Sequence, residues 1–181
     1  MLPQNCLIGS KVNKECLVQN AEYTVIGTVV KSELGNSNSQ NYSATMKIHC
    51  VLASFSQNIH GGAGIIGKEF IVNNWGLPHK GCPPGSGSEA VLNKPMIYFL
   101  SGATNPLTAF DVQDPCVGGI ELVDLVYVSN ALKNNPENNV TSCGAGYSVQ
   151  MPPPDDSKDV QDTNSSSYQH AFYYFVFILF I

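Results

Sequence analysis

The sequence predicts an all-β fold with a C-terminal helix, in which a five-stranded Greek-key barrel is cross-linked by disulfides and followed by a disordered stalk. Three observations predict it. Short β-branched and aromatic segments recur along the chain, separated by turns rich in glycine, asparagine and proline. Six cysteines are widely scattered, with no C-x-x-C pair. At Met151 the composition changes abruptly to proline, aspartate and serine.

Composition restricts the class of partner. The 181 residues provide room for one domain, and 43% of them are hydrophobic, which is enough for a core. Only 13% are charged, and the nine basic residues are all lysines. Arginine supplies the bidentate contacts that recognise phosphate and guanine. Its absence, with a net charge of −5, argues against a nucleic-acid partner.

Five segments have the composition of strands. The clearest alternates along 42–53, and a period of two is typical of a half-buried strand. One face of that strand is predicted to carry Tyr42, Ala44, Met46, Ile48, Cys50 and Leu52. The other is predicted to carry Ser43, Thr45, Lys47 and His49. The predicted strands are 22–31, 42–53, 68–75, 96–102 and 107–112.

A helix is expected after the fifth strand. The spacings of Ile120, Val123 and Val126, and then of Val128 and Leu132, suit one helix face, although the β-branched content also allows a strand. The helix would end at the Asn-Asn-Pro sequence 134–136. Five strands of one antiparallel meander followed by a helix indicate a small barrel of the OB type.

A glycine-rich segment at 62–67 matches the pattern G-x-G-x-x-G of dinucleotide-binding loops. That chemistry requires a helix to begin at the glycines, so that its first amides face the pyrophosphate. The next segment is instead a predicted strand. We therefore interpret the motif as the loop of an antiparallel hairpin.

The cysteines indicate an oxidising compartment. Scattered cysteines in even number fit long-range disulfides better than a zinc or dithiol site, which draws two ligands from one tight turn. The alternative is six free, buried thiols in a cytosolic protein. Sequons favour secretion as well, and we expect glycans at Asn41 and Asn139; a third sequon begins at Asn164. The cysteines are Cys6, Cys16, Cys50, Cys82, Cys116 and Cys143.

The C-terminal part divides the chain into a domain at 1–148, a flexible stalk at 149–170 and a hydrophobic tail at 171–181. The tail, "AFYYFVFILFI", would reach about 17 Å as a helix, short of the roughly 30 Å of a hydrocarbon core. A stalk followed by such a tail is typical of a glycosylphosphatidylinositol (GPI) attachment signal, removed on anchoring. Packing as a strand and a truncated membrane helix are the alternatives. Candidate attachment residues are Asp162, Asn164 and Ser165.

An anchor requires entry into the secretory pathway, but no signal peptide is visible in the first 14 residues. Either a segment precedes this sequence in the natural protein, or the anchor prediction is wrong.

The order of cysteines and strands resembles the netrin-like domain family, which includes the tissue inhibitors of metalloproteinases. Cys16 directly precedes the strand "AEYTVIGTVV", and Cys82 lies in a polar loop before the short strand "MIYFLSG". Cys116 follows "LTAFDVQDP", and Cys143 follows the expected helix. The resemblance covers about residues 6–143.

The resemblance implies an OB barrel whose working surface is the N-terminal segment with adjoining loops, here 2–6, 32–41 and 76–94. It also implies pairing of Cys16 with Cys143, and of Cys6 with Cys82 or Cys116, so that Cys50 takes the remaining partner. The inhibitors chelate the protease zinc through an N-terminal C-x-C, which this chain lacks. That mechanism therefore does not carry over.

Catalytic patterns are missing from the sequence: it contains no H-E-x-x-H, G-x-S-x-G or P-loop. Asp111, Asp114 and Glu121 could bind calcium, and His79 with Cys82 could be imagined as a nucleophile site, but solvated carboxylates and a disulfide explain them more simply. We expect a non-enzymatic domain, without cofactor or metal, that binds a protein or glycan partner at the cell surface. The alternatives are a protease inhibitor of the same fold and a surface hydrolase.

Overall fold

The computed structural model describes residues 6–8, 11–33, 42–55, 64–76, 88–102, 108–114 and 116–155. Its strands are β1 (Leu7–Ile8), β2 (Lys11–Val12), β3 (Tyr23–Glu33), β4 (Tyr42–Ser54), β5 (Glu69–Trp75), β6 (Pro95–Gly102), β7 (Ala109–Val112), β8 (Gly119–Ile120) and β9 (Asn139–Cys143). Its helices are α1 (Lys14–Asn20) and α2 (Leu125–Lys133), with the 3₁₀ turns η1 (Leu122–Asp124) and η2 (Pro136–Asn138).

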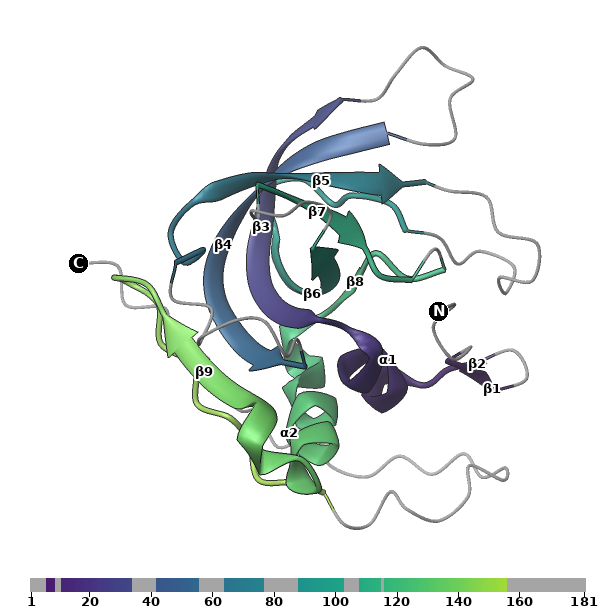
Figure 1. The fold of residues 1–181 in the computed structure, drawn as a ribbon, viewed down its shortest axis with the longest axis vertical. Helices are drawn as coiled ribbons and strands as arrows, with labels where there is room; N and C mark the ends of the chain where they lie inside the picture. The colour runs from purple at the N-terminus through teal and green to yellow at the C-terminus, as the bar shows by residue number, and fades with distance from the viewer. Residues whose placement is uncertain are drawn as a thin grey trace.

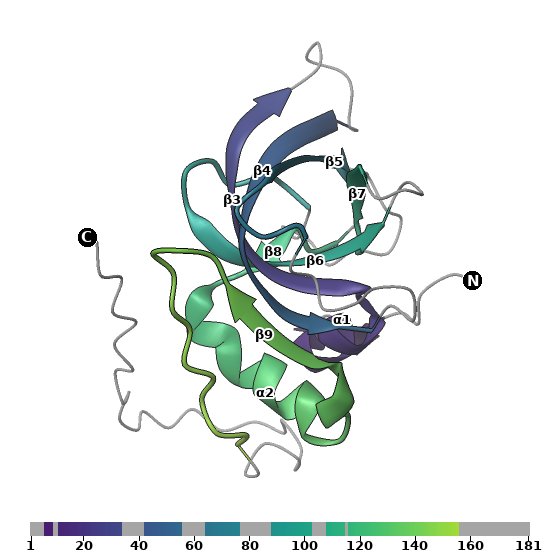
Figure 2. The ribbon, with the colours of Figure 1, turned by 60° about the vertical axis from the view of Figure 1, so that its left-hand side comes forward.

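Five strands close into a barrel (Figures 1 and 2). β3 pairs antiparallel with both β4 and β6, and β4 pairs antiparallel with β5. β5 runs parallel to β7, which returns antiparallel to β6 and completes the ring. The closed Greek-key order β3-β4-β5-β7-β6 confirms the predicted fold class.

The barrel interior is filled by large side chains from every strand of the ring. Tyr23 and Phe70 each contact Phe110 edge to face, with ring centroids 5.4 and 5.1 Å apart, and Trp75 contacts Tyr98 in the same way at 5.8 Å. These aromatic pairs prefer edge contacts because ring faces are negative and ring edges positive. Burial raises the pKa of Tyr23 and of Tyr98 to about 12, because it penalises the phenolate.

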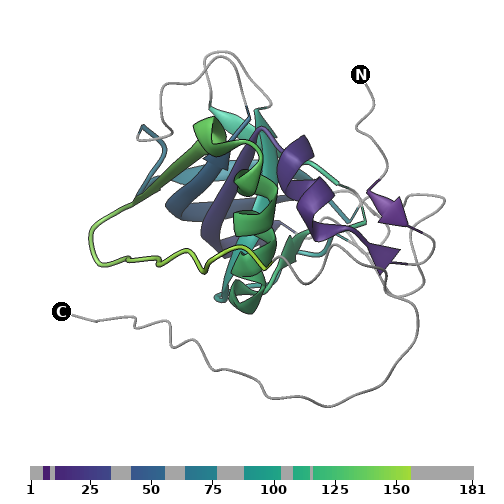
Figure 3. The ribbon, with the colours of Figure 1, turned by 90° about the horizontal axis from the view of Figure 1, so that it is seen from below.

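A second core, which we call the helix-side core, lies between the outer surface of the barrel and the helices α1 and α2, which pack side by side (Figure 3). Leu17 and Val18 from α1 and Val128 from α2 are fully buried with Ile26 and Phe99, which point outward from the barrel. This second layer explains why β3 and β6 are buried on both faces. The two helices are also joined electrostatically, through an ion pair of 2.7 Å between Lys14 and Asp124.

The alternation predicted for β4 holds only in its first half. Ala44, Met46 and Ile48 face the barrel interior as predicted. Cys50 and Leu52 were predicted on the same face but belong to the helix-side core. The reason is a register shift: Ile26 pairs with Cys50 while Gly27 pairs with Ile48, so His49 is an extra residue in β4. A bulge of this kind reverses the faces of the residues that follow.

The C-terminal helix is present but shorter than predicted. α2 begins at Leu125, so Ile120 lies in β8 and Val123 lies in η1 with 87% of its surface exposed. The prediction that both belong to one helix face with Val126 is wrong. Ile120 in the strand and Val123 in the 3₁₀ turn are spaced three residues apart, as residues on one helix face would be, although neither lies in the helix.

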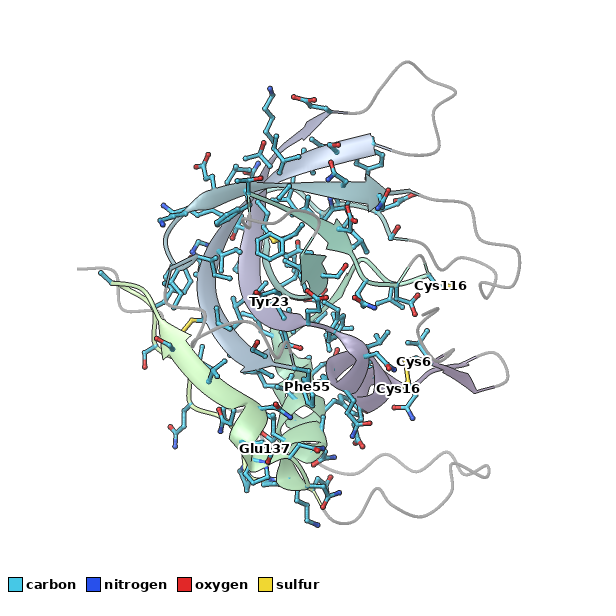
Figure 4. All side chains as sticks on the ribbon, viewed as in Figure 1. Cys6, Cys16, Tyr23, Phe55, Cys116 and Glu137 are labelled. Atoms are coloured by element: carbon cyan, nitrogen blue, oxygen red, sulfur yellow. A yellow bond between two sulfur atoms is a disulfide. The ribbon has the colours of Figure 1, made fainter. Side chains whose placement is uncertain are left out.

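The disulfides differ from the pairing that the family resemblance implied. Cys6 is bonded to Cys16 (Figure 4), and Cys50 is bonded to Cys143. The expected Cys16–Cys143 bridge is therefore wrong, and so are the expected bond of Cys6 to Cys82 or Cys116 and the pairing of Cys50 with whichever of those two remained. Cys16 lies in the first turn of α1, whose N-cap Asn13 accepts a 3.0 Å hydrogen bond from the Cys16 amide. The β1–β2 hairpin returns the chain so that Cys6 reaches it.

Cys116 is disulfide-bonded as well, and among the described cysteines none is free. Cys82 lies outside the described residues. The prediction of a disulfide-bonded barrel is thus confirmed, although the connectivity is not the one expected.

The glycine-rich segment at 62–67 precedes a strand rather than a helix. Its described part, 64–67, is a turn that ends at Gly67, where the φ angle is +78°. β5 follows and pairs antiparallel with β4. The hairpin interpretation is confirmed, since the described residues 64–67 form a turn that leads into a strand, not into a helix that could receive a pyrophosphate.

The described chain extends into the segment assigned to the stalk. After β9, residues 147–155 run back beside α2 (Figures 2 and 3). Val149 and Met151 pack against the helix-side core, and the amide of Asp155 donates a 2.8 Å hydrogen bond to Asn130 on α2. The rest of the predicted stalk and tail lies outside the described residues. Within the described ranges, neither helix has the length and hydropathy needed to cross a membrane.

Candidate binding surface

Among the described elements, the helices cover only one side of the barrel. They lie at one end of the view in Figure 1, whereas no described helix lies over β5 and the neighbouring ends of β3 and β4. We call the outward-facing part of β4, β5 and β7 the open face. It consists of Ser43, Thr45, Lys47, Glu69, Ile71, Asn73, Ala109 and Asp111.

An exposed apolar side chain occupies the centre of the open face. Along β5, Val72 faces the barrel core, so Glu69, Ile71 and Asn73 point outward. Ile71 pairs with Thr45 on β4 and is 53% exposed. Its other neighbour in the register is Ala109 on β7, which is a small residue.

A hydrogen-bonded polar row borders that isoleucine. The Ser43 hydroxyl donates to the side-chain oxygen Oδ1 of Asn73 at 2.8 Å. The Asn73 amide then donates to the Asp111 carboxylate and to the Phe110 backbone carbonyl, both at 3.3 Å. The three side chains come from three different strands and are held in one orientation. Such a row can recognise a ligand by hydrogen bonds without first being ordered.

Charge on and beside the open face is nearly balanced. Lys47 lies opposite Glu69 in the β4–β5 register, and Lys31 on β3 forms an exposed ion pair of 3.2 Å with Glu33. With Asp111 included, these residues comprise two lysines and three carboxylates. The surface therefore has no net positive charge that would attract the phosphate backbone of a nucleic acid. The face therefore suits a neutral or mixed-charge ligand.

His49 forms a second polar cluster, beneath the segment that follows β9. Its Nε2 lies 2.8 Å from the Thr28 hydroxyl and 3.3 Å from the Tyr147 hydroxyl. The imidazole also stacks on the Tyr147 ring, with centroids 4.0 Å apart and planes 11° apart. Burial, with Lys47 as a smaller cause, lowers the pKa of His49. The neutral ring therefore has a structural role, holding the return segment to β4.

The carboxylates considered as a calcium site do not come together. Asp111 is engaged with Asn73, Asp114 accepts a 2.7 Å bond from the Cys116 amide, and Glu121 pairs with Lys94 at 2.5 Å. Within the described ranges, no group of three histidine, cysteine, aspartate or glutamate side chains is arranged to hold a metal ion. His79, the other residue considered for catalysis, lies outside them.

The surface implied by the family resemblance is described only in part. Most of 2–6, 32–41 and 76–94 lies outside the described residues. Cys6, which is described, is 2% exposed and tied to α1, and its sulfur accepts a hydrogen bond from Asn20. It is therefore covered by the fold.

The modification sites predicted from sequence fall into two groups. Asn139 is exposed at the start of β9. Asn41, and the attachment candidates Asp162, Asn164 and Ser165, lie outside the described residues.

Sequence reasoning missed the open face and the His49 cluster. The open face had a detectable signal in the sequence. An alternating strand places Glu69, Ile71 and Asn73 on its outward side, and Ile71 is the one apolar residue among them. The His49 cluster had none, since Tyr147 is 98 residues away in the chain.

The fold and its surfaces define a disulfide-bonded barrel of the OB type with one open face. No protein-family model matches the sequence, and no curated protein is similar to it.

Proposed function

We propose that this protein is a non-enzymatic binding module of the cell surface or extracellular space, which recognises a protein or glycan partner. The observation that carries the proposal is the open face, where Ile71 is 53% exposed beside the ordered Ser43–Asn73–Asp111 row. An apolar centre with a hydrogen-bonding border is the usual anatomy of a recognition surface.

The position of this face supports a binding role. In OB barrels, ligands including oligosaccharides bind on the outer face of the second and third strands. Those strands correspond here to β4 and β5. The opposite outer surface is already covered by α1 and α2. Because the face carries no excess of positive charge, a carbohydrate or protein fits it better than a nucleic acid.

The disulfides support an extracellular location. Cys6–Cys16 and Cys50–Cys143 join elements that are separate in sequence, and Cys116 is bonded too. Structural disulfides persist in oxidising compartments. The same proposal includes three further features: glycans at Asn41 and Asn139, a GPI anchor attached near Asn164, and membership of the netrin-like domain family.

A protease inhibitor of the same fold is the less favoured function. That mechanism needs an accessible N-terminal cysteine, whereas Cys6 is buried and its carbonyl accepts a 2.8 Å hydrogen bond from the Asn13 amide. The hydrolase alternative depended on Asp111 or His79. Of these, Asp111 is engaged by Asn73 on an open, convex surface.

The proposal is tested by expressing the full chain behind a heterologous secretion leader in eukaryotic cells. We expect the protein on the cell surface, released by phosphatidylinositol-specific phospholipase C, with no free thiols in a non-reducing peptide map. The released protein is then applied to glycan arrays and to cells. Specific binding that Ile71→Lys abolishes supports the function. Intracellular protein with free thiols would contradict it.

A further inference from the structure

A groove separates α2 from the segment that returns after β9. It has a volume of about 270 Å³ and is lined by Ser129, Leu132, Pro136, Asn139, Met151 and Pro152, among others. This volume is slightly below the range of about 300–1,000 Å³ that small-molecule sites occupy. The groove therefore suits one compact group. Its walls are mostly aliphatic or proline side chains, yet three polar residues also line it, namely Ser129, Lys133 and Asn139.

The first polar side chain is Ser129. It is 6% exposed, and its hydroxyl has no hydrogen-bond partner within the described part of the chain. A buried polar group without a partner is unfavourable, and native structures nearly always supply one. The hydroxyl oxygen is itself covered by the surrounding protein, so it lies within the groove wall, and a group in the groove would contact the aliphatic and proline side chains instead.

Another is Asn139, the acceptor residue of the sequon Asn139-Val140-Thr141. Its carbonyl oxygen accepts two hydrogen bonds from Thr141, one from the hydroxyl at 2.7 Å and one from the backbone amide at 3.2 Å. Both bonds use the oxygen. The Asn139 amide nitrogen has no partner among the described residues, and the residue is exposed.

We propose that Asn139 carries an N-linked glycan whose first N-acetylglucosamine fills this groove. The inference rests on the proposed function, since the modification requires passage through the secretory pathway. A sugar attached to the Asn139 amide starts at the groove wall. The C–H face of the pyranose and its acetyl methyl would contact Leu132, Met151 and Pro152.

The covalent step is an ordinary substitution. The Asn139 amide nitrogen forms a bond to C1 of N-acetylglucosamine on a lipid-pyrophosphate-linked oligosaccharide. The bond from C1 to the pyrophosphate oxygen breaks and the lipid pyrophosphate leaves with its electron pair. The amide nitrogen gives up one proton. No oxidant or reductant is involved.

The sugar would join three elements of the fold. Residues of α2, of η2 and the start of β9, and of the segment 151–154 line the groove. The return segment is otherwise held by Val149 and Met151 and by the bond from the Asp155 amide to Asn130. Filling the groove would therefore slow local opening of residues 149–155.

The first measurement is glycan occupancy. The full chain, secreted from eukaryotic cells, is mapped by mass spectrometry before and after treatment with peptide N-glycosidase F. We expect occupancy at Asn139 in the wild type and in Thr141→Ser, and none in Thr141→Val or Asn139→Gln. A secreted, fully disulfide-bonded chain with unmodified Asn139 would overturn this inference and leave the proposed function standing.

The second measurement addresses the groove. Endoglycosidase trimming leaves one N-acetylglucosamine, and this form is compared with Asn139→Gln by hydrogen exchange of the peptide spanning 149–155. We expect exchange about tenfold slower with the single sugar. Equal exchange in the trimmed protein and Asn139→Gln would place the sugar in solvent and overturn the groove assignment. If the chain instead stays inside the cells with free thiols, the proposed function is overturned, and this inference with it.

Discussion

Cys50 and Cys143 lie directly opposite each other on β4 and β9, with Cα atoms 4.1 Å apart and a disulfide between them. The bond links the second half of β4 to a strand that follows the last helix, across 93 residues of sequence. It therefore encloses α2, β8 and four strands of the barrel in part or whole. Cys6 and Cys16, by contrast, close a loop of only 10 residues.

The first prediction follows from this difference in loop length. Replacing both Cys50 and Cys143 by alanine should lower the free energy of unfolding by about 4–5 kcal/mol, because the cross-link restricts the unfolded chain more as the loop lengthens. The double replacement Cys6→Ala with Cys16→Ala should cost about 2–3 kcal/mol by the same relation. Guanidinium unfolding of the oxidised proteins measures both. Equal losses would contradict the loop-length explanation.

The second prediction concerns pH. The pKa of His49 is lowered in the fold, so the unfolded chain takes up a proton first as pH falls below about 6.5. The free energy of unfolding should therefore decrease from pH 6.5 downwards until the folded-state pKa has been passed. His49→Gln, which keeps a polar contact with Thr28 and does not titrate, is the control. Urea unfolding at several pH values should show the wild type losing stability relative to the variant; a constant difference would exclude His49 as the cause.

The third prediction uses a close backbone approach at Gly118. A Cβ atom there would lie 2.9 Å from the Trp75 ring and 3.0 Å from the Glu89 carbonyl oxygen. Gly118→Ala should therefore cost about 1–3 kcal/mol through overpacking. Gly64→Ala is the matched control, because nothing lies within 4 Å of its Cβ, and it should change stability by less than about 0.5 kcal/mol. Trp75 is the one tryptophan of the chain, so its emission reports the repacking directly. An unchanged spectrum and stability in Gly118→Ala would contradict the packing described here.

The fourth prediction tests the open face. Ile71→Lys should weaken partner binding by at least about tenfold, because truncating or charging an apolar anchor removes most of its contact energy. The melting temperature should hardly change, since the side chain is 53% exposed. Val123→Lys is the control: that residue is 87% exposed in η1, on the side of the helices. If both variants bind like the wild type, the partner uses another surface.

Much of the barrel could be predicted from local sequence because its strands are locally specified. The segments that became β3, β4, β5 and β6 all exceed the four residues over which alternation or continuous apolar character is recognisable, and the four-residue β7 is marked by the apolar and aromatic residues of "LTAFDV". The hairpin interpretation of the glycine-rich segment succeeded for the same reason, since strands on both sides were already visible.

Short and capped elements escaped prediction. α1 has seven residues, and its signal was the Asn13 cap rather than a periodic pattern. β9 has five residues with mixed polarity, and it is a strand because β4 offers it a free edge. Elements of this length depend on tertiary packing more than on their own propensity.

By itself, the sequence determined the class of fold, the positions of five strands and the disulfide-bonded character, since these follow from local periodicity and composition. The tertiary structure alone decided which cysteines pair, because pairing depends on how the β1–β2 hairpin and β9 return to α1 and β4. It also decided the bulge at His49, which reverses the faces of β4. Finally, it decided the open face and the Asn139 groove, because each gathers side chains from elements that are distant in sequence and meet only when the chain has folded.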